Sequence, residues 1–103
     1  MTRLEWTDPA VTDLENIHDC LARDSPEYAN ALIARLIQSV ERLKPFPKSG
    51  RHVPEAPSTT VGELVVAGYR VIYRMRKEQV QILSVVHSAR NPAGMQPEPW
   101  DAA

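Results

Sequence analysis

Two segments in the first half of the chain place apolar residues at the spacing of an amphipathic helix. In residues 9–22 these positions are Val11, Leu14, Ile17, Leu21 and Ala22. In residues 26–43 they are Ala29, Leu32, Ile33, Leu36, Ile37, Val40 and Leu43. Steps of three and four residues form one stripe on a helix. Each segment opens with a capping residue followed by proline, Asp8–Pro9 and Ser25–Pro26, so we expect the helices to begin there. The connection is short, so the two helices should be antiparallel neighbours.

The apolar pattern changes to a period of two in the second half of the chain. "ELVVA" (residues 63–67) predicts one strand, and Gly68 marks a turn. "YRVIYRMR" (69–76) alternates tyrosines, Val71 and Met75 with Arg70, Ile72 and further arginines. "VQILSVVH" (80–87) is apolar on both faces, as expected for an interior strand, and residues 2–6 predict a short first strand.

The connecting segments are rich in proline. Residues 45–62 hold four of the nine prolines and two of the four glycines, which predicts a surface loop. Residues 91–103 form a Pro-rich tail, in which Trp100 is either loose or packed back. We therefore predict a single domain over residues 1–90, followed by the tail. Its fold class is α+β, with the order β-α-α-β-β-β and the helical hairpin packed on a small antiparallel sheet.

Composition limits where the protein acts. The chain has 103 residues, 43% of them hydrophobic and 24% charged, which is ordinary for one globular domain. No apolar run approaches the roughly 20 residues that span a bilayer, and the N-terminus lacks the apolar region of a signal peptide. Cys20 is the only cysteine, so no internal disulfide can form. We expect a cytoplasmic protein without membrane contact.

Charge is divided unevenly along the chain. Residues 1–44 carry five basic and eight acidic groups, a net −3, and residues 45–103 carry seven basic and five acidic groups, a net +2. A protein that grips nucleic acid through its phosphates is usually clearly basic, whereas this chain has a net charge of −1. We therefore expect no direct binding of nucleic acid.

Metal and hydrolase chemistry find little support in the sequence. His18 and Cys20 are two residues apart on a helix, which is a poor spacing for a shared metal. His87 and Ser88 are adjacent on a strand and should point to opposite faces, so they make a poor nucleophile–base pair. We expect no metal and no cofactor.

Three stretches of the sequence have a recognisable pattern, "WTDPAVTDLENIHDCLARDSPEYA", "LKPFPKSGRHVPE" and "VAGYRVIYRMRKEQVQILSVVHSAR". Together they resemble the ParE/RelE superfamily of toxins from type II toxin–antitoxin modules. The resemblance extends from Trp6 to Arg90, and the order of elements in the superfamily matches the order predicted from periodicity. One departure is Gly62, where many relatives carry an arginine.

The resemblance implies one of two mechanisms. RelE-like members are ribosome-dependent mRNA endonucleases, and ParE-like members poison DNA gyrase by protein contact. Arg70 matches an arginine of the nucleases, but non-nuclease relatives also have it. A second catalytic arginine is replaced by Ser88, a catalytic tyrosine falls near Gly94, and only Lys48 remains of the loop lysines.

We therefore expect a ParE-like gyrase inhibitor without catalytic residues. A RelE-like nuclease stays open as the alternative, and it would use Arg70, His87 and Arg90. An inert relative that still binds its antitoxin stays open as a third possibility, because Gly62 removes one positive charge.

The resemblance also implies a cognate antitoxin, ParD-like with a ribbon–helix–helix domain, in a hetero-oligomer with the toxin. The predicted antitoxin-binding residues are Leu14, Ile17, Leu21, Arg74 and Arg76. The predicted target-binding residues are Arg51, Arg70, Arg74, His87 and Arg90. Four of the arginines have structural alternatives. Arg74 and Arg76 could be solvated cations on an edge or face of the sheet. Arg90 could form an ion pair with Glu63 or Glu55, and Arg70 could brace the sheet by bonding to loop carbonyls.

Overall fold

The computed structural model describes residues 2–57, 60–95 and 98–101, and it contains two helices and five strands within those ranges. No helix in the described ranges is both long enough and apolar enough to cross a membrane. In chain order the elements are β1 (Arg3–Trp6), α1 (Asp8–Ala22), α2 (Pro26–Glu41), β2 (Arg51–His52), β3 (Val61–Val66), β4 (Tyr69–Arg76), β5 (Gln79–His87) and the 3₁₀ turns η1 (Pro92–Gly94) and η2 (Pro99–Asp101).

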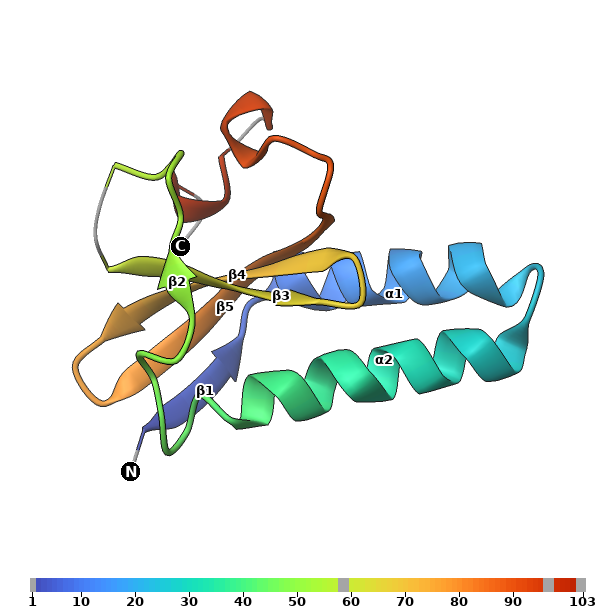
Figure 1. The fold of residues 1–103 in the computed structure, drawn as a ribbon, viewed down its shortest axis with the longest axis horizontal. Helices are drawn as coiled ribbons and strands as arrows, with labels where there is room; N and C mark the ends of the chain where they lie inside the picture. Colours follow the sequence, from blue (N-terminus) through green and yellow to red (C-terminus); the bar gives the residue numbers. More distant parts are fainter. Residues whose placement is uncertain (1, 58–59, 96–97, 102–103) are drawn as a thin grey trace.

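The five strands form one sheet in the order β1-β5-β4-β3-β2 (Figure 1). Strands β2 to β5 pair antiparallel in succession, and β1 joins the free edge of β5 in parallel. The predicted α+β class is confirmed, and the predicted elements occur in the predicted order with one addition, the two-residue strand β2 inside the predicted loop. Strand β5 is an interior strand, as its two apolar faces predicted. Periodicity did not predict that β1 is parallel to its neighbour, because the long connection through both helices carries no register signal.

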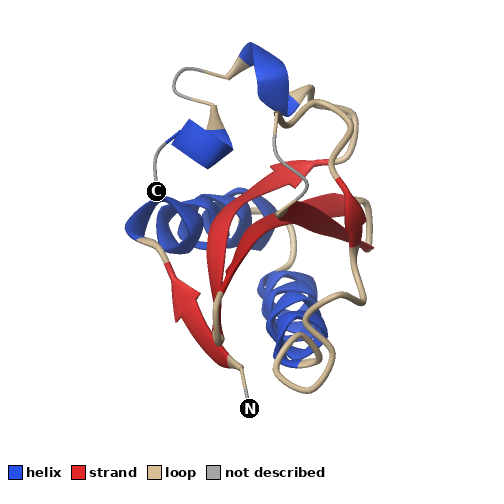
Figure 2. Ribbon diagram, turned by 90° about the vertical axis from the view of Figure 1, so that its left-hand side faces the viewer, coloured by secondary structure: helices blue, strands red, loops and turns tan. Residues whose placement is uncertain are grey.

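The sheet separates two apolar cores. The larger core lies between the sheet and the helices, and its buried residues are Ala10, Leu32, Leu36, Val40, Leu43, Val66, Val71, Tyr73, Val80, Ile82 and Val85. The smaller core lies on the opposite face, and its buried residues are Val53, Ala56, Val61, Ile72, Leu83, Val86 and Trp100. Figure 1 shows the tail in orange and red on one side of the sheet and α2 on the other, and Figure 2 shows the same layers after a quarter turn.

Trp100 is packed, which decides between the two alternatives that the sequence left open. Its side chain is 4% exposed in the smaller core, and Met95 packs beside that core. Pro92 and Pro99 are also buried. The described part of the tail therefore covers the sheet face that the helices leave free.

The start of each helix follows its sequence signal with one difference. Ser25 caps α2 as predicted, because its hydroxyl accepts a hydrogen bond from the Tyr28 N–H at 3.2 Å. In α1 the cap is Thr7 rather than Asp8, and the Thr7 hydroxyl makes no capping bond. It donates instead to the carbonyl of Ile82 at 2.6 Å, which ties the end of β1 to β5.

The helical stripes are narrower than the apolar pattern predicted. Val11 and Ile37 belong to the predicted stripes, but each is 41% exposed. On α1, Leu14, Ile17 and Leu21 are half-buried at the edge of the larger core. The stripe therefore overestimates the buried face of α1, part of which is open to solvent.

A β-bulge in β5 explains how this strand serves both cores. The register passes from Tyr73↔Ile82 to Ile72↔Ser84, so Leu83 is an extra residue without a partner on β4. Ile82 and Val85 are three residues apart and would face opposite sides of a regular strand. The bulge lets both contact the core beneath the helices, while Leu83 enters the smaller core.

Candidate functional site

The face of the sheet that carries the smaller core also carries a network of arginines and glutamates. Alternation along β3 and β4 places Glu63 and Arg70 on this face, because Val65 pairs with Arg70 directly. The β2–β3 register sets Arg51 opposite Glu63. Glu55 reaches the network from the loop after β2. Three strand positions and one loop position therefore meet at one end of the sheet.

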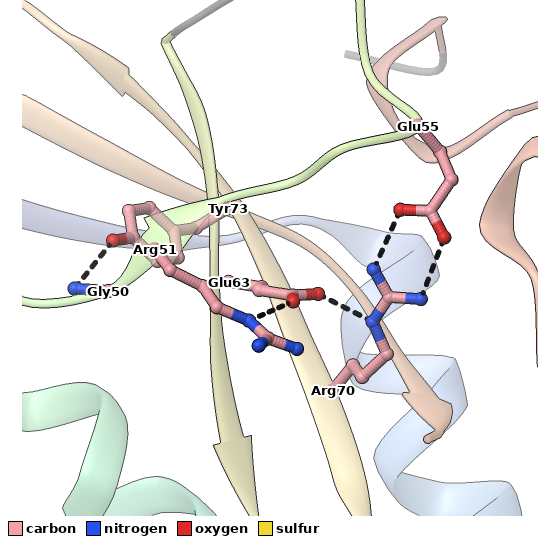
Figure 3. A network of polar contacts seen from close by, with 6 residues as sticks. All are labelled: Gly50, Arg51, Glu55, Glu63, Arg70 and Tyr73. Carbon is pink, nitrogen blue, oxygen red and sulfur yellow. Dashed lines mark hydrogen bonds and ion pairs between the residues drawn. The ribbon is translucent and has the colours of Figure 1, made fainter. Parts of the chain in front are cut away.

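Glu63 is the centre of this network, as Figure 3 shows. Its Oε1 accepts from Arg70 Nε at 2.5 Å, and its Oε2 accepts from Arg51 Nε at 2.6 Å. Arg70 also donates through Nη1 and Nη2 to the two oxygens of Glu55, at 3.2 and 3.0 Å. Glu63 is 1% exposed and Arg70 is 7% exposed. A buried carboxylate with an arginine on each oxygen is a structural arrangement, because the two charges compensate the cost of burying Glu63.

The electrostatics of the network favour its charged form. The hydrogen bonds from Arg70 lower the pKa of Glu55, and the hydrogen bonds to Glu55 raise the pKa of Arg70 against the opposing effect of burial. The two arginines and the two glutamates of the network balance each other in charge. Arg70 therefore braces the sheet, as one of its sequence alternatives suggested, but it does so through carboxylates and not through loop carbonyls.

A shallow pocket opens beside this network. Its volume is roughly 250 Å³, and it is lined by Arg51, Pro54, Glu55, Glu63, Val65, Arg70 and Ser88. Two predicted target-binding residues, Arg51 and Arg70, thus lie together, but their side chains differ in exposure to solvent. The Arg51 side chain is 68% exposed, and the Arg70 side chain is 9% exposed.

His87 lies on the other face of the sheet. It pairs with Tyr69 across β4 and β5, and the two rings meet edge to face with centroids 5.6 Å apart. Tyr69 packs against the core beneath the helices, whereas Arg70 is directly opposite Val86 of the smaller core. The His87 Nδ1 accepts a hydrogen bond from the Ala89 N–H at 3.2 Å, which orders the turn after β5. The structure therefore separates His87 from Arg70 by the thickness of the sheet.

Arg90 is exposed just after β5, and its N–H donates to the His87 carbonyl at 2.9 Å. The sequence offered Glu63 or Glu55 as ion-pair partners for Arg90. That prediction is wrong for the described residues, because Arg51 and Arg70 take both carboxylates. Arg90 is left on the surface, where it remains available to a partner.

The two remaining predicted arginines differ in their surroundings. Arg74 is half-buried and donates through Nη2 to the carbonyl of Trp100, so it helps to hold the tail against the sheet. Arg76 is exposed at the end of β4. Of these two arginines, Arg76 is the solvated surface cation.

A groove runs along the outer side of the helical hairpin. Its volume is roughly 570 Å³, and it is lined by Val11, Leu14, Glu15, Asn16, His18, Asp19 and Ile33. Of the predicted antitoxin-binding residues, Leu14 lines this groove, while Ile17 and Leu21 pack toward the core. Sequence reasoning missed that Val11 lines this groove, since it placed that residue on the buried stripe.

His18 lies in the wall of this groove and links the two helices. Its Nε2 is 2.7 Å from the Asn30 Oδ1, and its Nδ1 is 3.4 Å from the Asp19 Oδ1. These hydrogen bonds, the one to Asn30 foremost, raise the pKa of His18. The rim of the groove carries the carboxylates of Glu15 and Asp19, so the groove is apolar at its base and acidic at its edge.

Gly62 is explained by packing rather than by a missing charge. A Cβ atom at this position would lie 2.8 Å from the ring of Tyr73, which is 1% exposed. The Tyr73 hydroxyl accepts from the Gly50 N–H at 3.1 Å, and burial raises its pKa. The sequence gave no sign of this contact, because it joins residues on three separate segments.

Among the described residues, no group of three or more histidines, cysteines, aspartates or glutamates is arranged to hold a metal ion. The candidate functional features are therefore the arginines, His87, the pocket beside Arg70 and the groove on the helical hairpin.

The fold is that of the ParE/RelE superfamily of type II toxin–antitoxin modules. Residues 4–92 match the family described as "ParE toxin of type II toxin-antitoxin system, parDE", and the chain belongs to this family. It is 35% identical over 88 residues to "Putative toxin Y4kP" of Sinorhizobium fredii, covering 84% of this chain and 88% of that protein. It is 32% identical over 91 residues to "Toxin RelE2" of Caulobacter vibrioides, covering 87% and 99% respectively.

Solved structures agree on the fold. A chain of the chromosomal ParDE system from P. aeruginosa superposes with a TM-score of 0.71 at 24% identity, covering 84% of this chain and 96% of that one. A chain of the RelBE2 toxin–antitoxin complex from Mycobacterium tuberculosis superposes with a TM-score of 0.57 at 20% identity, covering 86% and 93%. The protein is thus a toxin of the ParE/RelE superfamily, and both branches share its architecture.

Proposed function

We propose that this toxin inhibits DNA gyrase by binding it, without a catalytic step of its own, and that a cognate antitoxin neutralises it. The observation that carries the proposal is the position of Arg70, the arginine that the chain shares with RelE-like nucleases. Its guanidinium is buried between Glu55 and Glu63, and His87 lies on the opposite face of the sheet. Such an arginine holds the protein together and is poorly placed to receive a phosphate.

The chemical requirements of strand scission support the same reading. RNA cleavage through the 2′-hydroxyl needs a base, a cation for the developing charge and an acid for the leaving oxygen, all close to one phosphate. The groups predicted for that role were Arg70, His87 and Arg90. Arg70 is on one face, His87 on the other, and Arg90 is on the surface after β5. They do not converge on one phosphate-sized position.

The groove on the helical hairpin suits an antitoxin. An amphipathic helix or an extended segment can place apolar side chains on Val11, Leu14 and Ile33, and basic side chains against Glu15 and Asp19. A ParD-like partner with a ribbon–helix–helix domain and a tail that folds on binding would form a hetero-oligomer with the toxin in this way. The family match to parDE toxins and the membership of both structural neighbours in toxin–antitoxin systems support such a partner. Both partners would act in the cytoplasm, where the target enzyme works.

A RelE-like endonuclease is the second candidate, and one observation favours it. The pocket of roughly 250 Å³ brings Arg51, Glu55, Arg70 and Ser88 together, and Glu55 could serve there as a base. The lowered pKa of Glu55 weakens it in that role, because a general base works best with a pKa near the working pH. The balanced charge of the network also leaves little attraction for a phosphate.

Two assays with purified toxin test the proposal. The toxin is added to a gyrase supercoiling reaction and, separately, to a translation reaction that contains a defined message. We expect supercoiling to stop and the message to stay intact, with antitoxin restoring supercoiling. Codon-phased cuts in the message that disappear in Glu55→Gln or His87→Ala would replace the proposal with the nuclease. Heat-denatured toxin is the control in both reactions.

A further inference from the structure

Arg51 stands at the outer edge of the sheet with one side of its guanidinium fixed. Strand β2 is two residues long and pairs only with β3. The Arg51 Nε donates to Glu63, whose side chain is fully buried, while the Arg51 side chain is 68% exposed. Figure 3 shows the two terminal nitrogens of Arg51 directed away from that carboxylate. Within the described ranges these nitrogens donate to no acceptor.

A guanidinium held through Nε keeps its end-on pair of N–H groups for another ligand. That pair matches the two oxygens of a carboxylate or a phosphate, and the fixed Nε reduces the rotamer freedom that binding must remove. The buried Glu63 thus prepares Arg51 to receive a second anionic group at the surface.

The neighbouring pocket selects the same kind of ligand. Its volume is roughly 280 Å³, and the residues in its lining that carry or can gain a positive charge are Arg51, Lys48 and His52, all of them exposed. No carboxylate of the described residues lines it. Its apolar wall consists of Val61, Met75 and the ring of Tyr73.

Two glycines let the ring of Tyr73 form part of this wall. Gly50 and Gly62 also line the pocket, and a Cβ atom at either position would collide with Tyr73. The pocket therefore has a cationic edge over an apolar wall, which fits an acidic side chain together with the methylene groups that carry it.

We infer that Arg51, Lys48 and His52 form a docking site for an aspartate or glutamate side chain on the protein target of the toxin. The inference rests on the proposed function, since it takes the target to be a protein. A nucleic acid would present a row of phosphates. Glu55 lines the adjoining pocket together with Arg51, and the whole chain has a net charge of −1, so this surface attracts such a row weakly. The acidic rim of the helical groove suits a basic antitoxin segment. The two surfaces therefore select partners of opposite charge.

The decisive variant is Lys48→Glu, which reverses one charge without touching Glu63. The matched control is Lys77→Glu, which makes the same change of charge at an exposed position in the β4–β5 turn. Arg51→Lys keeps the charge at position 51 but removes the paired N–H groups. Each variant is first compared with wild type by melting temperature and by binding to the antitoxin, so that loss of folding is recognised.

Growth arrest on induction and inhibition of purified gyrase are then measured for all three variants. We expect Lys48→Glu and Arg51→Lys to lower both effects about tenfold or more, and Lys77→Glu to behave as wild type. Full activity of folded Lys48→Glu and Arg51→Lys would overturn the inference, and so would a wild type without effect on growth. Binding of wild-type toxin to single-stranded RNA that is lost in Lys48→Glu would also overturn it. Growth arrest without gyrase inhibition would instead remove the proposed target, and the variants would still test the docking site through growth.

Discussion

The buried carboxylate of Glu63 is the residue on which one end of the sheet depends. It is 1% exposed and accepts from Arg70 at 2.5 Å and from Arg51 at 2.6 Å. Ion pairs of this kind are costly to form because both charges leave water, yet they are costlier to break. Removing one partner leaves the other charge buried without compensation.

Replacing Glu63 with alanine should therefore destabilise the protein strongly. Arg70 would keep Glu55 but lose the acceptor for its Nε inside the sheet. We expect the free energy of unfolding to fall by about 3–5 kcal/mol. Urea unfolding followed by circular dichroism measures the change, with the exposed Glu78→Ala as control, which should stay within about 0.5 kcal/mol of wild type. Equal stabilities for the two variants would mean that the network does not hold the sheet.

The pairing of Glu55 with Arg70 should make stability depend on pH in a predictable direction. Arg70 lowers the pKa of Glu55 in the folded protein. The unfolded chain therefore binds this proton more readily than the folded chain. The contribution of Glu55 is fully present above the unfolded pKa of about 4.3 and is lost as the pH falls through the folded value.

We expect wild type to exceed Glu55→Gln in unfolding free energy at pH 6, and the difference to shrink as the pH falls below about 4. Urea titrations at half-unit steps between pH 6 and pH 3 measure it. A difference that stays constant over this range would show that the Glu55 carboxylate is not held by Arg70.

Sequence reasoning found the basic residues of the candidate site but not their partners. It named Arg51 and Arg70 and even named Glu55 and Glu63, but it offered the glutamates only as alternative partners of Arg90. The pattern of a strand tells which face a side chain takes, but only the register between strands tells which side chains meet. The β2–β3 register brings Arg51 to Glu63, and no feature of the loop sequence encodes that pairing.

At the scale of elements, the helices were easier to predict than the strands that carry the site. The capping of α2 and the order of elements followed from local signals. The bulge at Leu83 did not, because Ile82 and Val85 read as residues on opposite faces of a regular strand. Two donors next to the bulge bond to a helix. The Asp13 carboxylate on α1 accepts hydrogen bonds from the Val85 N–H at 2.9 Å and from the Ser84 hydroxyl at 2.8 Å.

The hairpin between β3 and β4 offers a direct test of backbone strain. Its two loop residues, Ala67 and Gly68, have φ values of 52° and 86°. Positive φ at both positions fits a type I′ turn, which suits the twist of a two-residue hairpin but disfavours alanine. The left-handed conformation costs a residue with a Cβ atom roughly 1–2 kcal/mol.

We expect Ala67→Gly to raise the free energy of unfolding by about 1 kcal/mol, and Gly68→Ala to lower it by about the same amount. Among the described residues other than its two chain neighbours, none has an atom within 4 Å of the place where a Cβ at position 68 would lie, so that change tests conformation without a collision. Melting temperatures measure both, with a shift of about 4–8 °C for each kcal/mol. Opposite signs would mean that the turn has another conformation in solution.

At the scale of the whole molecule, the two halves of the chain present surfaces of opposite charge. The helical half carries −3, and the half that contains strands β2 to β5 carries +2. One surface is a groove with an acidic rim on α1 and α2, and the other is a basic pocket at the edge of the sheet. If the basic pocket binds the target and the acidic groove binds the antitoxin, as proposed above, this division of charge keeps the two contacts of a small domain distinct.

The tail raises the last question at this scale, which is where the toxin domain ends. The sequence placed the boundary at residue 90, and the family match ends at residue 92. Trp100 nevertheless fills the smaller core beside Val53, Ile72 and Leu83, and Arg74 donates to its carbonyl. Burial of so large a side chain in a core predicts that the tail contributes to the stability of the domain.

Trp100→Ala should thus lower the free energy of unfolding by about 3–5 kcal/mol, the usual cost of truncating a buried aromatic residue. The control is Asp101→Ala, an exposed neighbour that should change stability by less than about 0.5 kcal/mol. Truncation after Asn91 supplies the second measurement, because it removes the whole segment that covers this face. If both Trp100→Ala and the truncated chain unfold at the same urea concentration as wild type, the tail rests on the domain without supporting it and the boundary belongs at residue 90. If both shift together, the smaller core requires the tail, and the domain extends to Asp101.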